Sequence, residues 1–168
     1  FSQMERTLAL MQIERILDTF NDAKEYGSIL NVDACDWEVL ERFVDDLGTG
    51  GQISFESVGS EETQESLRKL VRVARNLGQK YDAVVTNPPY MGSSGMGTKL
   101  SRYVKDNYND SKSDFFAVFI EKCRKLSGNN RYYAMITQPS FLFLNSYEKL
   151  RKKILNEETI LNMLHMGR

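Results

Sequence analysis

The sequence is poor in the side chains that build metal sites and nucleophilic centres. It has a single histidine, His165, and two cysteines, Cys35 and Cys123, which lie far apart without metal-ligand spacing. Because a zinc site and a nucleophilic triad both need several such groups together, we expect neither. Two thiols without a disulfide framework fit a reducing, cytoplasmic compartment. His165 lies within the apolar residues 161–166 and is expected to be a packed residue.

Long apolar runs are also missing. No segment approaches the roughly 18 apolar residues that a membrane span needs, and no signal peptide is present, so no membrane partner is expected. The chain begins at Phe1, which we interpret as the start of a piece of a longer polypeptide, with a processed mature protein as the alternative. Hydrophobic residues at 41% and charged residues at 27% are typical of a globular domain.

Charge is divided unevenly along the chain. Residues 1–66 hold fifteen acids and four bases, whereas residues 67–168 hold eight acids and eighteen bases. A phosphate-binding face would leave this distribution, and solvated helix surface is the alternative, which we favour for the last cluster. The bases form three clusters: Arg68, Lys69, Arg72 and Arg75; Lys99, Arg102, Lys105 and Lys112; and Lys149, Arg151, Lys152 and Lys153.

Helical periodicity dominates the first half. Residues 3–25 carry an apolar stripe at near-helical spacing, made of Met4, Leu8, Met11, Ile16 and Phe20. We predict a short strand over residues 26–32 and a helix over residues 36–47 whose first residue is the cap. Residues 48–59 hold four glycines and are expected to form a loop, and a third helix over residues 61–77 is expected to stop at the next glycine.

Strands and helices alternate in the second half. We predict a short buried strand over residues 81–86, a glycine- and serine-rich loop over residues 91–97, and a helix over residues 113–126. A turn at 127–130, a strand over 131–137, a helix over 147–156 and a strand over 159–166 are expected to follow. This alternation indicates an α/β fold with a parallel, doubly wound sheet, in a single domain that spans residues 1–168.

The most specific signal is Asn-Pro-Pro-Tyr at residues 87–90, directly after the strand expected at 81–86. Ligands of open α/β sheets bind at the carboxyl ends of the strands, where this tetrapeptide falls. Two consecutive prolines stiffen the backbone and remove two N–H donors. The Asn87 side chain and the Pro88 carbonyl can then accept both hydrogens of an amino group, while Tyr90 offers a flat face on which a base can stack.

This tetrapeptide resembles motif IV of the methyltransferases that act on amino groups of adenine and, more widely, of glutamine or guanine. Residues 113–122 resemble the helix that follows motif IV, and residues 132–141 resemble the next strand and its pocket-lining end. Residues 148–151 and 160–167 are similar to the helix and strand that come next. Residues 23–30 and 163–168 look most like the adenine-specific methyltransferases of bacterial phage-growth-limitation (BREX-type) defence systems.

The resemblance implies transfer of a methyl group from S-adenosylmethionine to the N6 amino group of a flipped DNA adenine, in restriction-modification or phage defence. It implies a partial Rossmann-like methyltransferase fold, and direct transfer that needs no metal. The expected catalytic residues are Asn87, Pro88, Pro89 and Tyr90, with residues 81–97 as the motif IV region; the expected cofactor contacts are Ser28, Asn87 and Pro89; and the expected DNA contacts are Lys99, Arg102, Lys105 and Lys112.

The sequence departs from the family in its cofactor half. The family's glycine-rich turn after the first strand, and the acidic residue after the second, are not found, because the glycines at 48–51 follow a helix. Gly27 and Ser28 stand where related enzymes often place Asp or Asn. We therefore expect the first strands of the cofactor half to be absent, so that this chain alone binds little S-adenosylmethionine. It is expected to rely on the rest of its own polypeptide, with self-association covering the bare sheet edge.

Two other functions stay open from the sequence. One is a methyltransferase that acts on RNA or protein glutamine, which methylation of plasmid DNA against tRNA would distinguish. The other is a non-catalytic DNA-binding or specificity module of a larger methyltransferase, in which a change of Asn87 would leave the function of the full protein intact.

Overall fold

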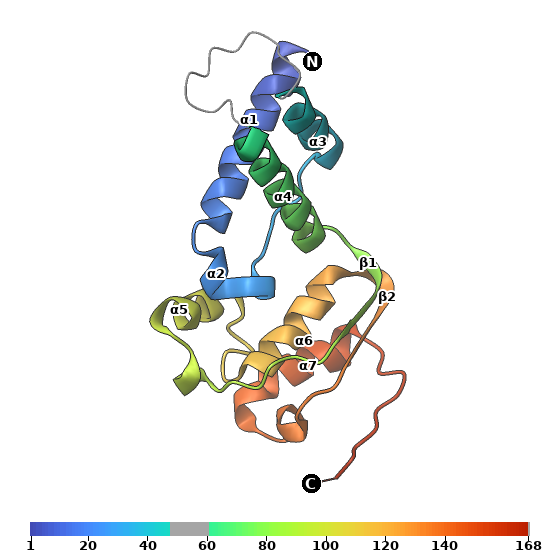
Figure 1. The fold of residues 1–168 in the computed structure, drawn as a ribbon. Helices are drawn as coiled ribbons and strands as arrows, with labels where there is room; N and C mark the ends of the chain where they lie inside the picture. The colour runs from blue at the N-terminus through green and yellow to red at the C-terminus, as the bar shows by residue number, and fades with distance from the viewer. Residues whose placement is uncertain (48–60, 168) are drawn as a thin grey trace. The chain divides into compact units, whose positions relative to one another are not determined.

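The computed structural model describes residues 1–47 and 61–167 and divides into two compact units, Phe1–Gln79 and Lys80–Arg168 (Figure 1). The first unit is helical and the second contains the sheet. The loop predicted over residues 48–59 lies outside the described residues. Each unit has its own core.

Helix α1 (Gln3–Phe20) begins with a reciprocal cap. The Ser2 hydroxyl accepts from the Glu5 N–H at 3.2 Å, and the Glu5 carboxylate accepts from the Ser2 N–H at 2.8 Å. The predicted apolar stripe of α1 is wrong in part, because the helix buries Ala9, Ile13 and Ile16 while the Met4 side chain is 83% exposed. The helix also ends at residue 20 and not at 25.

The strand predicted over residues 26–32 is wrong. Helix α2 (Ala23–Tyr26) and the 3₁₀ turn η1 (Gly27–Ile29) occupy most of it. Gly27 has φ of +56°, a left-handed conformation that interrupts an extended strand. A strand also needs a neighbour to satisfy its backbone, and among the described residues the sheet consists of β1 and β2, which lie later in the chain.

Helices α3 (Trp37–Asp46) and α4 (Glu61–Gly78) complete the first unit and confirm the two predicted helices. Asp36 caps α3 as predicted, since its Oδ1 accepts from the Val39 N–H at 3.1 Å. Ion pairs join the two helices at Arg68–Asp45 and Arg75–Glu41, both at 2.7 Å. The buried core of α1, α3 and α4 consists of Ala9, Ile13, Ile16, Val39, Leu40, Phe43, Val44, Val71 and Ala74.

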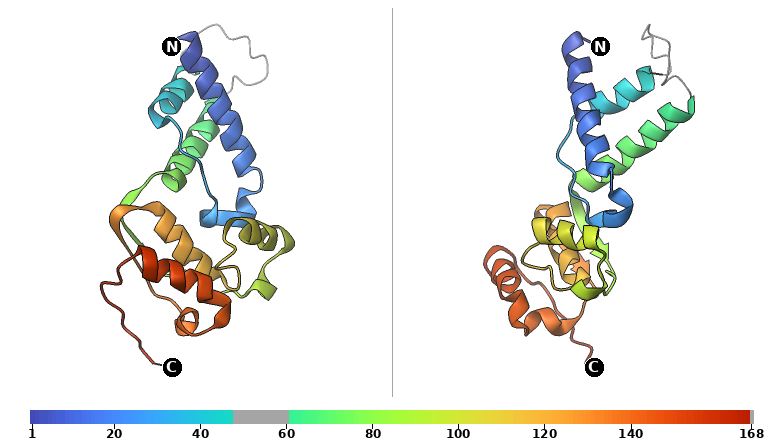
Figure 2. Two further views of the ribbon diagram at one scale, coloured as in Figure 1. Left: turned by 180° about the vertical axis from the view of Figure 1, so that it is seen from behind. Right: turned by 90° about the vertical axis from the view of Figure 1, so that its left-hand side faces the viewer.

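The second unit is built on two parallel strands, β1 (Tyr81–Thr86) and β2 (Ser127–Met135). Between them the chain forms the 3₁₀ turn η2 (Ser93–Gly95) and helices α5 (Thr98–Asn107) and α6 (Phe115–Leu126). Figure 2 shows α6 running alongside the strand pair. The α/β class, the parallel pairing and the bounds of β1 are confirmed, and this is a partial version of the expected fold.

The register of β1 and β2 changes near their start. Tyr81 pairs with Ser127, whereas Ala83 pairs with Tyr132, so the extra residues of β2 form a bulge. Asn130 lies in this bulge at φ of +56°, a conformation that asparagine tolerates better than most residues. The turn predicted at residues 127–130 is therefore part of an irregular strand.

After β2 the chain forms two 3₁₀ turns, η3 (Pro139–Leu142) and η4 (Asn145–Tyr147), and helix α7 (Glu148–Glu157). One buried core cluster of this unit consists of Phe116, Ala117, Ile120, Tyr147, Leu150 and Ile154. The final strand predicted over residues 159–166 is wrong, because residues 158–167 have no strand partner among the described residues. His165 is exposed on this segment, so its predicted packing is also wrong.

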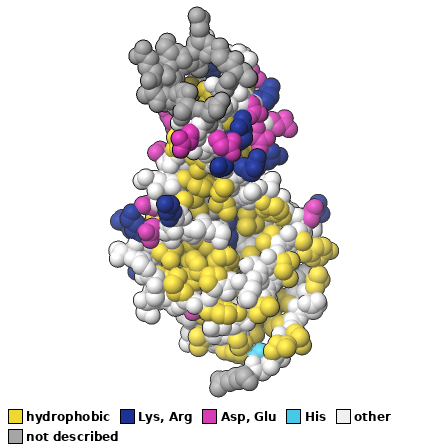
Figure 3. Space-filling model, viewed as in Figure 1, with side chains coloured by type: hydrophobic (Ala, Val, Ile, Leu, Met, Phe, Trp, Pro, Cys, Tyr) yellow, Lys and Arg dark blue, Asp and Glu magenta, His cyan; other side chains and the backbone are white. Residues whose placement is uncertain are grey.

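One face of the strand pair is exposed. The strand β1 was expected to be buried, yet the exposed fractions are 78% for Val85, 63% for Tyr132 and 67% for Ile136. A parallel sheet is normally covered on both faces, and α6 packs against these strands. The face of the second unit seen in Figure 3 is accordingly rich in hydrophobic side chains.

Two kinds of feature are absent from the part of the chain that the structure describes. No helix within residues 1–47 and 61–167 is long and apolar enough to cross a membrane. In the same ranges, no group of three or more His, Cys, Asp or Glu side chains is placed to hold a metal ion.

Candidate active site

The Asn-Pro-Pro-Tyr turn follows β1 at its carboxyl end, next to the end of β2. The Ile136 N–H donates to the Thr86 carbonyl at 3.3 Å, and the Tyr90 hydroxyl donates to the Ile136 carbonyl at 3.4 Å. The turn is thus joined to Ile136, the residue directly after β2, on both sides of the two prolines. Pro88 is buried, whereas Asn87, Pro89 and Tyr90 are exposed.

Two hydrogen-bond acceptors of this turn have no partner among the described residues. Neither the Asn87 side chain nor the Pro88 carbonyl accepts a hydrogen bond from a residue in the described ranges. Because Pro88 is buried, the backbone that carries its carbonyl is held in place. An amide oxygen and a fixed carbonyl are the groups that an incoming amino group needs.

The ring of Tyr90 is supported on one side and open elsewhere. Its centroid lies 6.2 Å from that of Phe116, at an interplanar angle of 61°, and Phe116 is fully buried. Nearly half of Tyr90 is exposed, at 48%. The ring therefore has a rigid apolar support and can still accept a planar group.

The carboxylate of Asp114 ties the turn to the start of α6. Its Oδ1 accepts from the Met91 N–H at 3.2 Å and from the Phe116 N–H at 3.3 Å. Backbone bonds extend this attachment: the Phe115 N–H donates to the Met91 carbonyl at 2.9 Å, and the Ser93 N–H donates to the Ser113 carbonyl at 3.0 Å. The residues that follow Tyr90 are thus bound to the same helix that supports its ring.

Sequence reasoning missed this role of Asp114. The available signal was an Asp directly before the apolar run of residues 115–120, which is the pattern of a helix cap. The cap is present, but the same oxygen also serves the backbone of Met91. A cap that binds a second segment cannot be recognised from local sequence, because the partner is 23 residues away.

The four predicted DNA-contacting bases lie on and after α5. Lys99, Arg102 and Lys105 are exposed on this helix, whereas Leu100 and Val104 are buried on it. No described residue pairs with Arg102 or Lys105. Lys112 follows the helix and its ammonium donates to Asn109 Oδ1 at 2.8 Å. These positions agree with a basic surface, and the role of the residues in DNA binding stays a prediction.

Ser28, the predicted cofactor contact in the first half, is exposed on η1 of the first unit. Asn87 and Pro89, the other two predicted contacts, belong to the second unit. The role of all three toward a cofactor stays a prediction.

The thiols do not supply a nucleophile. Burial raises the pKa of Cys123 to about 11, and burial also raises the pKa of Cys35. Both groups are therefore protonated at neutral pH. Burial, and secondarily the charge of Asp114, raises the pKa of Tyr147, whose ring lies 5.9 Å from that of Phe116 beneath the turn. Tyr147 thus stays neutral and acts as packing.

Comparison with known proteins identifies the family of this chain. The family model described as Eco57I restriction-modification methylase matches residues 6–168. The chain is 38% identical over 154 residues to the adenine-specific methyltransferase PglX of Lacticaseibacillus casei (strain Zhang), covering 90% of this chain and 13% of that protein. It is 37% identical over 154 residues to the adenine-specific methyltransferase BrxX of Escherichia coli O9:H4 (strain HS), covering 91% and 12%.

A third relative, the type II methyltransferase M.VspI of Vibrio sp. (strain 343), is 29% identical over 110 residues, covering 62% of this chain and 26% of that protein. The chain thus spans about one eighth of the length of the first two relatives. The resemblance drawn from Asn-Pro-Pro-Tyr and the segments after it is confirmed: the chain belongs to the Eco57I restriction-modification methylase family.

Proposed function

We propose that this chain is the catalytic segment of a DNA methyltransferase that transfers a methyl group from S-adenosylmethionine to the N6 amino group of adenine. The observation that carries the proposal is the Asn-Pro-Pro-Tyr turn at the end of β1, with two acceptors that have no described partner and a supported, half-exposed ring. Two relatives named adenine-specific methyltransferases, PglX and BrxX, support adenine as the substrate.

Asn87 and Pro88 orient the amino group. An exocyclic amino group has two N–H bonds, and Asn87 Oδ1 and the Pro88 carbonyl accept one each. Because both hydrogens are drawn toward acceptors, the nitrogen lone pair is less delocalised into the ring and is free to form a new bond. The rigid Pro88-Pro89 backbone holds this arrangement before the substrate arrives, which removes a reorganisation cost from the reaction.

Tyr90 receives the base. An adenine inside a duplex cannot reach the turn, so the base must leave the stack. Stacking on an aromatic side chain contributes about 1–3 kcal/mol per base, which offsets part of the cost of unstacking. The contact with Phe116 and the hydrogen bond to Ile136 fix the ring in place for that purpose.

Exposed side chains of the site suit the methyl donor, S-adenosylmethionine. The exposed Asn87 amide and Pro89 ring in the second unit are the groups that would hold it, and the exposed Ser28 hydroxyl of the first unit is a separate candidate contact. When bound, S-adenosylmethionine supplies an electrophilic methyl group on a sulfonium. Asn87 would thus serve both substrates, keeping the amino nitrogen aligned with the transferred group.

The basic side chains of α5 are proposed to contact the DNA backbone. Arg102 and Lys105 lie three residues apart on the exposed side of the helix and have no described partner. Unpaired cations on one helix face release counterions when they bind phosphates, which favours nucleic acid over a protein substrate. Lys99 and Lys112 lie at the two ends of this basic stretch.

The exposed face of the strand pair supports an interaction with the rest of the polypeptide. Val85, Tyr132 and Ile136 form an apolar surface at a position that a parallel sheet normally buries. Because the match covers only 13% and 12% of the first two relatives, further segments of the same polypeptide are the proposed cover. The two reduced thiols and a DNA substrate favour the cytoplasm.

A methylation assay on the intact protein tests the proposed function. The protein is incubated with S-adenosylmethionine labelled on the methyl group and with plasmid DNA, tRNA or a glutamine peptide in parallel. We expect label in plasmid DNA, and N6-methyladenine after digestion to nucleosides. Label in tRNA or peptide alone would contradict the DNA assignment, and no label in any substrate would favour a non-catalytic module.

A further inference from the structure

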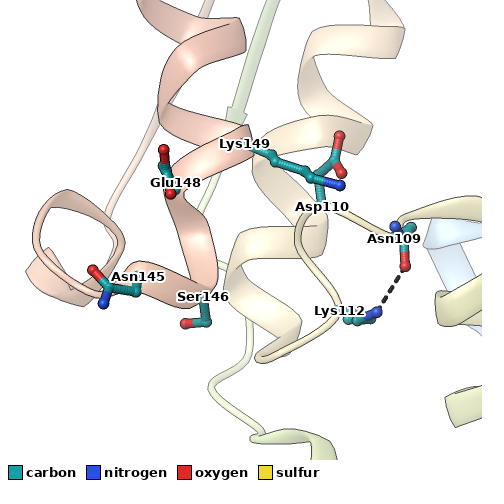
Figure 4. A pocket seen from close by; sticks show the side chains of 7 residues that line it. All are labelled: Asn109, Asp110, Lys112, Asn145, Ser146, Glu148 and Lys149. Atoms are coloured by element: carbon teal, nitrogen blue, oxygen red, sulfur yellow. Dashed lines mark hydrogen bonds between the residues drawn. The ribbon is translucent and has the colours of Figure 1, made fainter.

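A cavity of the second unit lies away from the Asn-Pro-Pro-Tyr turn. It has a volume of about 230 Å³ and opens between the segment after α5 and the start of α7 (Figure 4). A water molecule takes about 30 Å³ of liquid volume, so the cavity has room for a phosphate group and several waters. Its lining consists of Asn109, Asp110, Lys112, Asn145, Ser146, Glu148 and Lys149.

The two acids of the lining are neutralised by lysines that do not line the cavity. Glu148 pairs with Lys152 at 2.7 Å, one helical turn further along α7. Asp110 pairs with Lys153 from the same helix. The last basic cluster of the sequence is therefore not simply solvated helix surface, because two of its members compensate carboxylates at this cavity.

The two lysines of the lining keep their charges uncompensated. Lys112 donates to Asn109, which is neutral. Lys149 has no hydrogen bond or ion pair with any described residue. After the two ion pairs of Asp110 and Glu148 are formed, the cavity retains two positive charges from Lys112 and Lys149.

The position of Lys149 is not explained by helix stability. Lys149 is the second residue of α7, and a cation in the first turn of a helix opposes the helix dipole. The same helix end has no side-chain cap. An anion bound at this place would offset both costs. The side chains of Asn145 and Ser146 add neutral donors to the lining.

We propose that this cavity binds a phosphodiester group of the DNA backbone through Lys112 and Lys149. The inference rests on the proposed function, which supplies DNA as the substrate, and it adds Lys149 and the cavity to the contact already expected from the bases on and after α5, of which Lys112 is one. It separates Lys149 from the other bases of α7: Arg151 donates to the carbonyls of Phe141 and Leu144, and Lys152 and Lys153 hold the acids. A free phosphate ion has the same chemistry and is distinguished by the experiment.

The experiment measures duplex binding by fluorescence anisotropy over a range of salt concentrations. It compares the intact protein with the double variant Lys112→Gln/Lys149→Gln and with a matched control, Lys69→Gln/Arg72→Gln, which removes the same charge from exposed positions of α4. Circular dichroism confirms that each variant is folded. Inorganic phosphate is titrated into the wild type and the double variant by calorimetry in parallel.

The double variant is expected to bind duplex about tenfold more weakly near 0.1 M salt. Its slope of log affinity against log salt should be smaller by about one, the change for one lost phosphate contact, with the control unchanged. If the wild type methylates DNA and the double variant has an unchanged salt slope, the proposed phosphate site in the cavity is wrong and the proposed function still holds. A wild type that does not methylate DNA would overturn the proposed function itself. Micromolar binding of inorganic phosphate that the double variant loses, with the slope unchanged, would replace DNA by a free phosphate.

Discussion

The basic clusters on α4 of the first unit and α5 of the second unit differ in their partners. In the first unit, Arg68 and Arg75 of α4 pair with acids of α3 at 2.7 Å. In the second unit, Arg102 and Lys105 of α5 have no described partner. Both clusters look alike in the sequence, so a run of bases indicates a phosphate-binding surface only after the acids of neighbouring helices have been placed. The ion pairs give Arg68 and Arg75 a structural role, and DNA binding by Arg102 and Lys105 stays a prediction.

The units also differ in how well each is covered. Helices α1, α3 and α4 bury a common core, whereas β1 exposes Val85 near its carboxyl end. Truncation of a core side chain of the first unit is thus expected to lower the free energy of unfolding strongly. Truncation on the exposed strand face of the second unit should change it little.

The largest effect is expected from Phe43→Ala in the 168-residue chain. Phe43 is buried in the core of the first unit and its ring also packs edge-on against that of Phe1, so truncation should lower the free energy of unfolding by about 3–5 kcal/mol. The matched change Val85→Ala should cost less than about 0.5 kcal/mol, because the side chain is exposed. Urea unfolding followed by circular dichroism measures both. A loss above about 1 kcal/mol at Val85 would contradict an exposed strand face.

Asn87→Ala in the intact protein is expected to lower kcat about 100-fold, which corresponds to roughly 2.7 kcal/mol of the activation barrier. The reason is that Asn87 orients the amino group during the reaction and makes little contact before it. DNA affinity should stay within about twofold of wild type. Single-turnover methylation and anisotropy measure the two quantities, and retention of more than a tenth of kcat would remove Asn87 from its assigned role.

Asp114→Ala should lower kcat about tenfold, because the Met91 and Phe116 N–H groups lose their shared acceptor and the turn loosens. Asp114→Asn keeps an oxygen at that position and should restore most of the rate. A purely charge-based role would instead make Asn as harmful as Ala. The comparison is made on kcat at saturating DNA, with thermal unfolding of each variant measured alongside.

Tyr90→Ala should weaken capture of the flipped base by about tenfold, within the range of 1–3 kcal/mol for stacking on an aromatic ring. Tyr90→Phe keeps the ring and loses the hydrogen bond to the Ile136 carbonyl, so a change below about twofold is expected. A fluorescent adenine analogue at the target position reports flipping. Equal signals from the two variants would argue against stacking.

The smallest effect is expected from charge reversal of Arg102 and Lys105 together. DNA affinity should fall severalfold, with a smaller salt slope by about one to two, because about 0.9 is lost per phosphate contact. The same reversal at Lys69 and Arg72 in the first unit is the control and should leave the slope unchanged. If the two pairs behaved alike, the distinction between the units would fail.

The sequence predicted those features that depend on neighbouring residues in the chain. The bounds of β1, the cap at Asp36 and the end of α4 at Gly78 follow from short patterns, and each is confirmed. The position of Asn87 at a strand end was predictable because ligands of α/β sheets gather there. Resemblance to the family added the order of the later segments.

Features that depend on distant partners could not be predicted. Residues 26–32 and 159–166 have strand-like composition, but a strand exists only where another strand pairs with it. The burial of α1 depends on where α3 packs, which placed Ala9 and Ile13 inside and Met4 outside. Asp114 gained its second hydrogen bond from a loop that only the fold brings near.

The parallel pairing of β1 and β2 also has a kinetic consequence. Ala83 pairs with Tyr132, and the whole crossover with α5 and α6 lies between them. The entropy of closing this long loop must be offset before the strand contacts contribute, which is the property that slows folding in proteins with non-local contacts. The helices can form early from local contacts, whereas the turn that carries Asn87 reaches its final place only when the two strands meet. The candidate active site is therefore expected to be among the last parts of the second unit to fold.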